Sequence, residues 1–85
     1  MTDLNAWAEK PLTRAELAKF LEEVAQSVER DPGEWENTTL DRFLEAMSAW
    51  VVDMDGSFTN RGLPVPTTPT WQLFAQMVLA GLIYE

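Results

Sequence analysis

Carboxylates are the side chains of this sequence that most readily suggest acid–base or metal chemistry. The 85 residues include 14 Asp and Glu but no His and no Cys. The chain therefore lacks the commonest general base, the commonest soft nucleophile and the usual zinc ligands. Paired carboxylates can act as acid and base without His, and the most suggestive pair is Asp53 and Asp55, which precede Gly56.

The Asp53-x-Asp55-Gly56 sequence resembles part of a calcium-binding loop, which has a glycine at its sixth position and a bidentate glutamate at its twelfth. With Gly56 at the sixth position, the first position is Val51 and the twelfth is Gly62, so two essential carboxylates are missing. We therefore interpret this sequence as the end of a helix, with Gly56 in the left-handed C′ position. The chain is predicted to have no catalytic residues, no metal site and no cofactor, and not to be an enzyme.

Acidic side chains are concentrated in residues 31–55, where seven carboxylates and a single base, Arg42, give a net charge of −6. One interpretation is a solvated face whose acids compensate the dipole at a helix N-terminus. The other is a patch that attracts a basic protein and speeds its association. On the second interpretation, the candidate partner-binding residues are Glu34, Trp35, Glu36, Asp41 and Glu45.

Trp35 differs from the other tryptophans because it lies in a turn between two glutamates. It can pack as a staple onto the helix that follows it, or it can stay exposed as the kind of residue that dominates interface centres. Two functional classes therefore remain open. The first is a non-enzymatic protein–protein interaction module with a basic partner. The second is a small-molecule or metal-binding helical domain that uses the aromatic side chains and the Asp53/Asp55 corner.

The overall charge of −8 excludes several kinds of partner. Nucleic-acid and membrane-surface binding both need clustered Lys and Arg, so neither is expected. The N-terminus has no basic and apolar regions typical of a signal peptide, and the apolar run from Leu73 to Tyr84 is too short to span a bilayer. We expect a cytoplasmic protein that is a monomer or a weak homodimer and has no disulfide.

The spacing of apolar residues predicts an all-α fold, a compact bundle of three main helices. The first helix begins after Thr13, which can form a capping box with Glu16, and ends at Arg30. Its apolar stripe recurs at intervals of three and four residues and consists of Leu17, Phe20, Leu21, Val24 and Val28. The second helix begins after Thr38 or Thr39 and ends at Asp55-Gly56. Its stripe consists of Leu40, Phe43, Leu44, Met47, Trp50, Val51 and Met54.

The third helix is predicted to begin with Pro69, because the first helical position does not need an N–H donor. Its residues are apolar on nearly all sides, which indicates a position in the middle of the bundle. Trp71 and Phe74 are therefore expected in the core, and Gln72 and Gln76 are expected at the one edge that contacts water.

Two segments have no helical period. Residues 1–12 form either a loose segment or a short turn that lays Trp7 on the bundle, whereas residues 13–85 are predicted to be a single helical domain. Residues 57–67, between the second and third helices, form a long Pro-containing loop. Its apolar residues Phe58, Leu63 and Val65 favour a packed crossover over a binding loop.

Several segments together resemble a family of small acidic bacterial proteins that is classified as a domain of unknown function. The segments are Glu34-Trp35-Glu36-Asn37-Thr38-Thr39-Leu40, Phe43-Leu44-Glu45-Ala46, Ala49-Trp50, Asp53-Met54-Asp55-Gly56, Asn60, Gly62, Pro64-Val65-Pro66, Trp71, Phe74-Ala75 and Tyr84-Glu85. The resemblance extends from about Thr13 onward and implies a bacterial, cytoplasmic, single-domain protein without assigned catalytic residues. For such a chain, one form of the interaction module is an immunity or antitoxin-like protein that binds a basic toxin.

Overall fold

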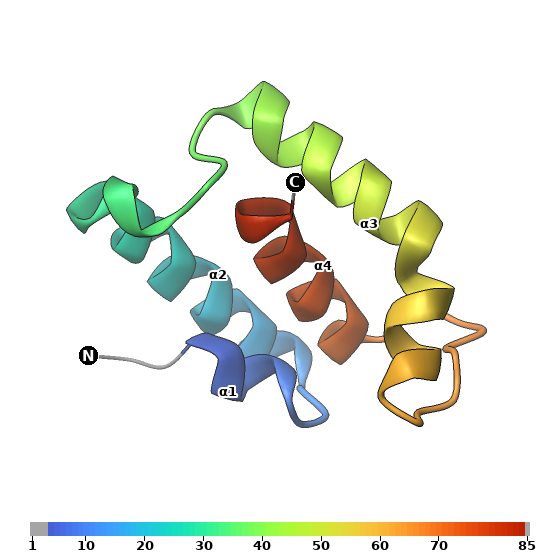
Figure 1. Cartoon of the computed structure of the whole chain (residues 1–85). Coiled ribbons are helices and arrows are strands. Elements are labelled where there is room, and N and C mark those ends of the chain that lie inside the picture. The colour runs from blue at the N-terminus through green and yellow to red at the C-terminus, as the bar shows by residue number, and fades with distance from the viewer. Residues whose placement is uncertain (1–3, 85) are drawn as a thin grey trace.

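The computed structural model describes residues 4–84, and all of its regular elements are helical (Figure 1). The elements are α1 (Leu4–Ala8), α2 (Arg14–Arg30), the 3-10 helix η1 (Pro32–Glu34), α3 (Leu40–Asn60) and α4 (Trp71–Ile83). No strand occurs within residues 4–84, so the predicted all-α fold is confirmed. Residues 1–3 of the N-terminal segment and Glu85 lie outside the described part of the chain.

The central element is α4, because it contacts each of the other three helices, while α2 and α3 do not contact one another (Figure 1). The predicted position of the third main helix in the middle of the bundle is therefore correct. Its buried side chains include Ala75, Val78, Leu79 and Leu82, which join residues of α1 and α2 in one apolar core. Phe20 of α2 is 0% exposed and is the largest fully buried side chain in the described residues.

The start of α2 has the capping box expected from the sequence. The Thr13 hydroxyl oxygen accepts from the backbone N–H of Glu16 at 3.1 Å, and the Glu16 carboxylate accepts from the backbone N–H of Thr13 at 3.0 Å. The pKa of Glu16 is lowered mainly by the hydrogen bond from the Thr13 backbone amide and, to a smaller extent, by a hydrogen bond with the Thr13 side chain. Both bonds satisfy donors that a helix N-terminus otherwise leaves unpaired, so α2 begins at Arg14 as predicted.

The predicted end of the second main helix is wrong, because α3 continues through Asp55-Gly56 to Asn60. A glycine inside a helix costs about 0.5–1 kcal/mol relative to alanine. Continuing the helix buries Phe58, whose ring lies edge-on to that of Trp50 at a centroid distance of 6.4 Å. Burial of a Phe side chain stabilises by about 1.5–3 kcal/mol, which outweighs the cost of the glycine. The left-handed conformation occurs instead at Gly62, where φ is 69°.

The start of α4 also differs from the prediction. Its N-cap is Thr70, whose hydroxyl oxygen accepts from the backbone N–H of Leu73 at 3.0 Å, so Pro69 precedes the helix rather than opening it. The connection between α3 and α4 therefore comprises residues 61–70 rather than 57–67, because α3 ends later and α4 begins later than expected. Within it, Val65 is half-buried, and the backbone N–H of Leu63 donates to the Phe58 carbonyl at 3.0 Å.

Candidate partner-binding surface

Trp35 is packed, but onto α2 rather than onto the helix that follows it. Its indole N–H donates to the hydroxyl oxygen of Ser27 at 3.1 Å, and Ser27 is buried. The half-buried Trp35 ring also packs against the apolar core formed by α1, α2 and α4. A buried hydroxyl with a partner avoids the cost of an unsatisfied polar group. Trp35 therefore fixes the η1 turn to the bundle.

The residues after Trp35 close the C-terminal end of α4. The backbone N–H groups of Glu36 and Asn37 both donate to the Leu82 carbonyl, at 3.1 and 2.9 Å. The Asn37 side-chain amide donates to the carbonyls of Gly81 at 3.1 Å and Tyr84 at 2.8 Å. These bonds satisfy acceptors that a helix C-terminus leaves free. No local signal in the sequence marks this role of Asn37, because its partners lie more than 40 residues away.

The four carboxylates predicted to bind a partner, those of Glu34, Glu36, Asp41 and Glu45, are all exposed. The first two lie beside Trp35, whereas Asp41 and Glu45 are one turn apart on α3. Hydrogen bonds from the Thr39 hydroxyl and then from the backbone N–H of Arg42 lower the pKa of Asp41. We call Trp35 and these four residues the acidic turn surface. Its tryptophan packs against the bundle, and its carboxylates face solvent.

The orientation of α4 overturns two expectations about its side chains. The side-chain amides of Gln72 and Gln76 both donate to the Ala8 carbonyl at 3.1 Å, so this edge of α4 faces α1 and is half-buried. Because a helix has 3.6 residues per turn, side chains two residues apart point to nearly opposite sides of it. Trp71 and Phe74 accordingly point away from this edge and are 47% and 42% exposed. Neither is the core residue that its apolar stripe suggested.

The same side of the molecule carries exposed apolar residues of α2 and α3. On α2, the carboxylate of Glu23 accepts a hydrogen bond from the indole N–H of Trp7, so the side of α2 that carries Glu23 faces α1. Leu21, two residues before Glu23, lies on the opposite side of α2. On α3, Trp50 and residues of α1 line the same hollow, so the side of α3 that carries Trp50 faces α1. Leu44 lies on the other side of α3. We call the surface turned away from α1 the apolar face. It consists of exposed Leu21, Leu44, Val51, Trp71 and Phe74 with half-buried Met47, Met54 and Met77.

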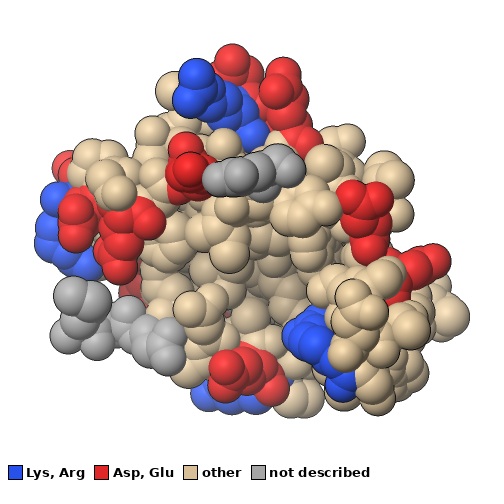
Figure 2. All heavy atoms as spheres, viewed as in Figure 1, with Lys and Arg blue, Asp and Glu red and all other residues tan. Residues whose placement is uncertain are grey.

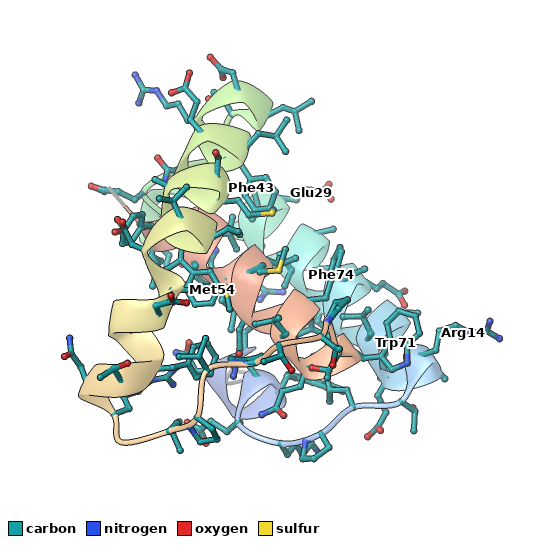
Figure 3. The ribbon with its side chains drawn as sticks, turned by 90° about the vertical axis from the view of Figure 1, so that its right-hand side faces the viewer. Arg14, Glu29, Phe43, Met54, Trp71 and Phe74 are labelled. Carbon is teal, nitrogen blue, oxygen red and sulfur yellow. The ribbon has the colours of Figure 1, made fainter. Side chains whose placement is uncertain are left out.

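The apolar face includes the first two turns of α4, from Trp71 to Met77, whereas the residues from Val78 to Leu82 are buried. Figure 3 shows Phe43 at one end of the face, Phe74 in the middle and Trp71 at the other end. Glu29 lies near the first of these ends and Arg14 near the last (Figure 3). At the Trp71 end the surface is hollowed into a cavity of about 700 Å³. Its apolar lining includes Pro11, Leu12, Pro69, Trp71, Phe74 and Met77.

Figure 2 shows the side of the molecule that is viewed in Figure 1. Charged side chains surround a broad uncharged centre on this side, with acidic groups outnumbering basic ones (Figure 2). A shallower hollow of about 530 Å³ lies between α1 and α3 and is lined in part by Trp50, Arg61 and Ile83. The guanidinium group of Arg61 lies over the ring of Phe58, 4.8 Å from its centroid.

The Asp53/Asp55 corner does not assemble a ligand set. Both residues lie within α3, and the Asp53 carboxylate accepts a hydrogen bond of 2.7 Å from the Tyr84 hydroxyl. That bond raises the pKa of Tyr84. Within residues 4–84, no group of three His, Cys, Asp or Glu residues is placed to hold a metal ion.

None of the helices in the described part of the chain is long and apolar enough to cross a membrane.

Comparison with known proteins agrees with the resemblance found in the sequence. No curated protein and no solved structure matches the chain. A family model, described as a family of unknown function (DUF7660), matches residues 13–85. The match covers the three main helices and the turn that contains Trp35, and the chain therefore belongs to the DUF7660 family.

Proposed function

We propose that this protein is a non-enzymatic protein-binding module whose partner is basic. The observation that supports the proposal is the apolar face, where five large apolar side chains from three helices stay exposed on one side. Large apolar side chains that stay exposed together on one side mark interaction sites in proteins that are otherwise well packed. The net charge of −8 favours a basic partner, because complementary charge accelerates encounter and suppresses wrong partners.

A bacterial cytoplasmic immunity or antitoxin-like protein is one form that this function can take. In that case the basic partner is a toxin, and the carboxylates of the acidic turn surface contribute to its attraction. Because exposed charges act mainly on the rate of encounter, they need not belong to the part of the surface that is buried in the complex. The proposal therefore assigns a steering role to Glu34, Glu36, Asp41 and Glu45 and a contact role to the apolar face.

The experiment that tests the proposal measures association kinetics with a basic partner isolated from the native host. The association rate is expected to fall as salt is added, and the double substitution of Asp41→Asn with Glu45→Gln is expected to flatten this dependence. Replacement of Lys19 and Arg42 by Gln changes the net charge by the same amount in the opposite direction and should accelerate association. Association that responds neither to salt nor to these substitutions would contradict a basic partner.

The absence of catalysis is tested separately. We expect no turnover of ester, phosphoester or glycoside substrates, since the chain has no His and no Cys. Reproducible turnover that is lost in Asp53→Asn or Asp55→Asn would show that the protein is an enzyme.

Small-molecule binding is the second candidate, and the cavity beside Trp71 is the observation that favours it. Its volume of about 700 Å³ and its largely apolar lining are typical of sites for small apolar ligands. A ligand that prefers the native state must raise the melting temperature. Screening apolar compounds for such a rise, and for a change in tryptophan fluorescence that Trp71→Phe abolishes, would identify this function.

A further inference from the structure

We infer that the apolar face is the docking site for a basic amphipathic α-helix of a partner protein, which packs along α4 between α2 and α3. The inference rests on the proposed function and specifies the place and the form of the partner. Its starting point is the arrangement of the helices. Three sides of α4 are covered by α1, α2 and α3, while α2 and α3 do not contact each other across the fourth (Figure 1). One more helix would complete the bundle.

The spacing of the residues on this face suits a helix as the occupant. On α2 the exposed side chains of Ala18, Leu21 and Ala25 follow one another at intervals of three and four. On α3, Leu44, Met47, Val51 and Met54 have the same alternation. These intervals are the ones by which helices pack against helices. The exposed Ala18 and Ala25 leave room for close approach. An extended peptide has no sheet edge to extend, because residues 4–84 contain no strand.

The row formed by Trp71, Phe74 and Met77 sets the direction of the incoming helix. These residues are three apart and form a ridge of α4, and such a ridge crosses at about 20° when it packs into the grooves between residues four apart on a second helix. The partner helix therefore runs nearly parallel or antiparallel to α4. With 13 residues, α4 is about 20 Å long at 1.5 Å per residue. A partner helix of about four turns covers it.

The charges beside the apolar face select a basic partner over a second copy of this chain. Glu22 and Glu29 border the stripe of α2, and Asp41 and Asp55 border that of α3. All four acidic residues are exposed. Arg14 is a basic residue that also borders the apolar face, and it lies at the Trp71 end (Figure 3). Two copies would place like charges against each other, since each carries −8. A helix with Lys or Arg flanking its apolar stripe meets the opposite sign.

The test uses a synthetic peptide of about 18 residues, five helical turns, with Leu at helical spacing and Lys at the flanking positions. A peptide of identical composition in scrambled order, which has no continuous apolar stripe, is the control for charge alone. Affinities are measured by calorimetry, and the binding site is located by NMR of the methyl and indole groups. We expect the striped peptide to bind at least about tenfold more tightly than the scrambled one. Shifts should concentrate at Leu21, Leu44, Val51 and the Trp71 indole.

Two substitutions on α3 provide a matched pair. Leu44, on the apolar face, is 52% exposed, whereas Val52, which points away from it, is 78% exposed. Both Leu44→Asp and Val52→Asp add one negative charge to the same helix. Leu44→Asp is expected to weaken binding of the striped peptide about tenfold or more, and Val52→Asp to change it less than about twofold. Circular dichroism melting curves establish that both variants are folded, and Leu44→Ala replaces Leu44→Asp if that variant is not.

Each alternative outcome identifies what is wrong. Equal binding of both peptides, or no binding of the striped one, overturns the helix as occupant. Shifts confined to the acidic turn surface, or a natural basic partner that binds Leu44→Asp as tightly as the wild type, overturn this site but leave the proposed function standing. A dimer in sedimentation analysis that Leu44→Asp dissociates and Val52→Asp does not would show that a second copy is the occupant.

Discussion

Gly81 of α4 lies directly against Phe43 of α3: a Cβ atom at Gly81 would be 2.8 Å from Phe43 Cε1 and 3.2 Å from the Phe43 carbonyl oxygen. The ring can rotate away, but the carbonyl belongs to the backbone of α3. We therefore expect Gly81→Ala to destabilise the protein by about 1–3 kcal/mol through overpacking. This cost exceeds the gain of about 0.8–1 kcal/mol that alanine brings to a helix interior.

Gly56 is the matched control for this substitution, because it also lies within a helix but has nothing within 4 Å of the position of an added Cβ. Gly56→Ala should stabilise by about 0.5–1 kcal/mol. Urea denaturation measures both changes. A Gly81→Ala protein as stable as Gly56→Ala would show that α3 and α4 are not held in close contact at this point.

The hydrogen bond between the Trp35 indole and Ser27 is expected to contribute about 0.5–1.5 kcal/mol. Trp35→Phe removes the donor and keeps most of the ring, while Ser27→Ala removes the acceptor. A double-mutant cycle isolates the coupling energy of the pair. If the two effects on the free energy of unfolding are additive, the bond contributes nothing measurable and Trp35 is held by apolar packing alone.

The burial of aromatic residues predicts an order of effects that differs from the one indicated by the sequence. Phe20→Ala should destabilise by about 3–5 kcal/mol, because Phe20 is fully buried. Trp71→Ala and Phe74→Ala should cost clearly less, because nearly half of each side chain is exposed to solvent. Thermal denaturation of the three variants gives the order directly. Losses as large for Trp71 and Phe74 as for Phe20 would place both in the core and remove the apolar face.

Tyr84 is expected to titrate above its ordinary pKa of about 10, because its hydroxyl donates to the Asp53 carboxylate. The folded state favours the protonated phenol, so this contribution to stability is fully present below the unfolded pKa. It is lost as the pH rises through the higher folded pKa. The chain has one Tyr, so tyrosinate absorbance reports this group alone.

The control for the tyrosine titration is the neighbouring carboxylate of Asp55. Asp53→Ala should lower the titration midpoint of Tyr84, whereas Asp55→Ala should leave it nearly unchanged. A midpoint that does not respond to Asp53→Ala would mean that the hydrogen bond is not formed in solution.

The elements that could be predicted from the sequence are those that local interactions define. The start of α2 depends on Thr13 and Glu16, three residues apart, and its end depends on the sequence that directly follows Arg30. The end of α3 could not be predicted in the same way. It depends on the burial of Phe58, whose ring packs edge-on against Trp50 two turns earlier in the same helix, and this burial outweighs the local preference of Gly56.

The candidate site shows the same limit. Helical spacing identified Trp71 and Phe74 as members of an apolar stripe, but spacing does not show whether another helix covers that stripe. The hydrogen bonds of Gln72 and Gln76 to the Ala8 carbonyl set the rotation of α4, and both depend on a partner more than 60 residues away. A polar pair on an otherwise apolar helix therefore marked a half-buried contact with α1 rather than an edge fully exposed to water.

Because α2 and α3 contact α4 but not each other, the stability of the chain is unevenly distributed. Local opening that separates α3 leaves the contacts of α1 and α2 with α4 in place, and separation of α2 leaves those of α3. Neither opening exposes all sides of α4. Its backbone amides should therefore exchange with deuterium only when the whole chain unfolds, while the amides of the two flanking helices exchange through smaller, independent openings.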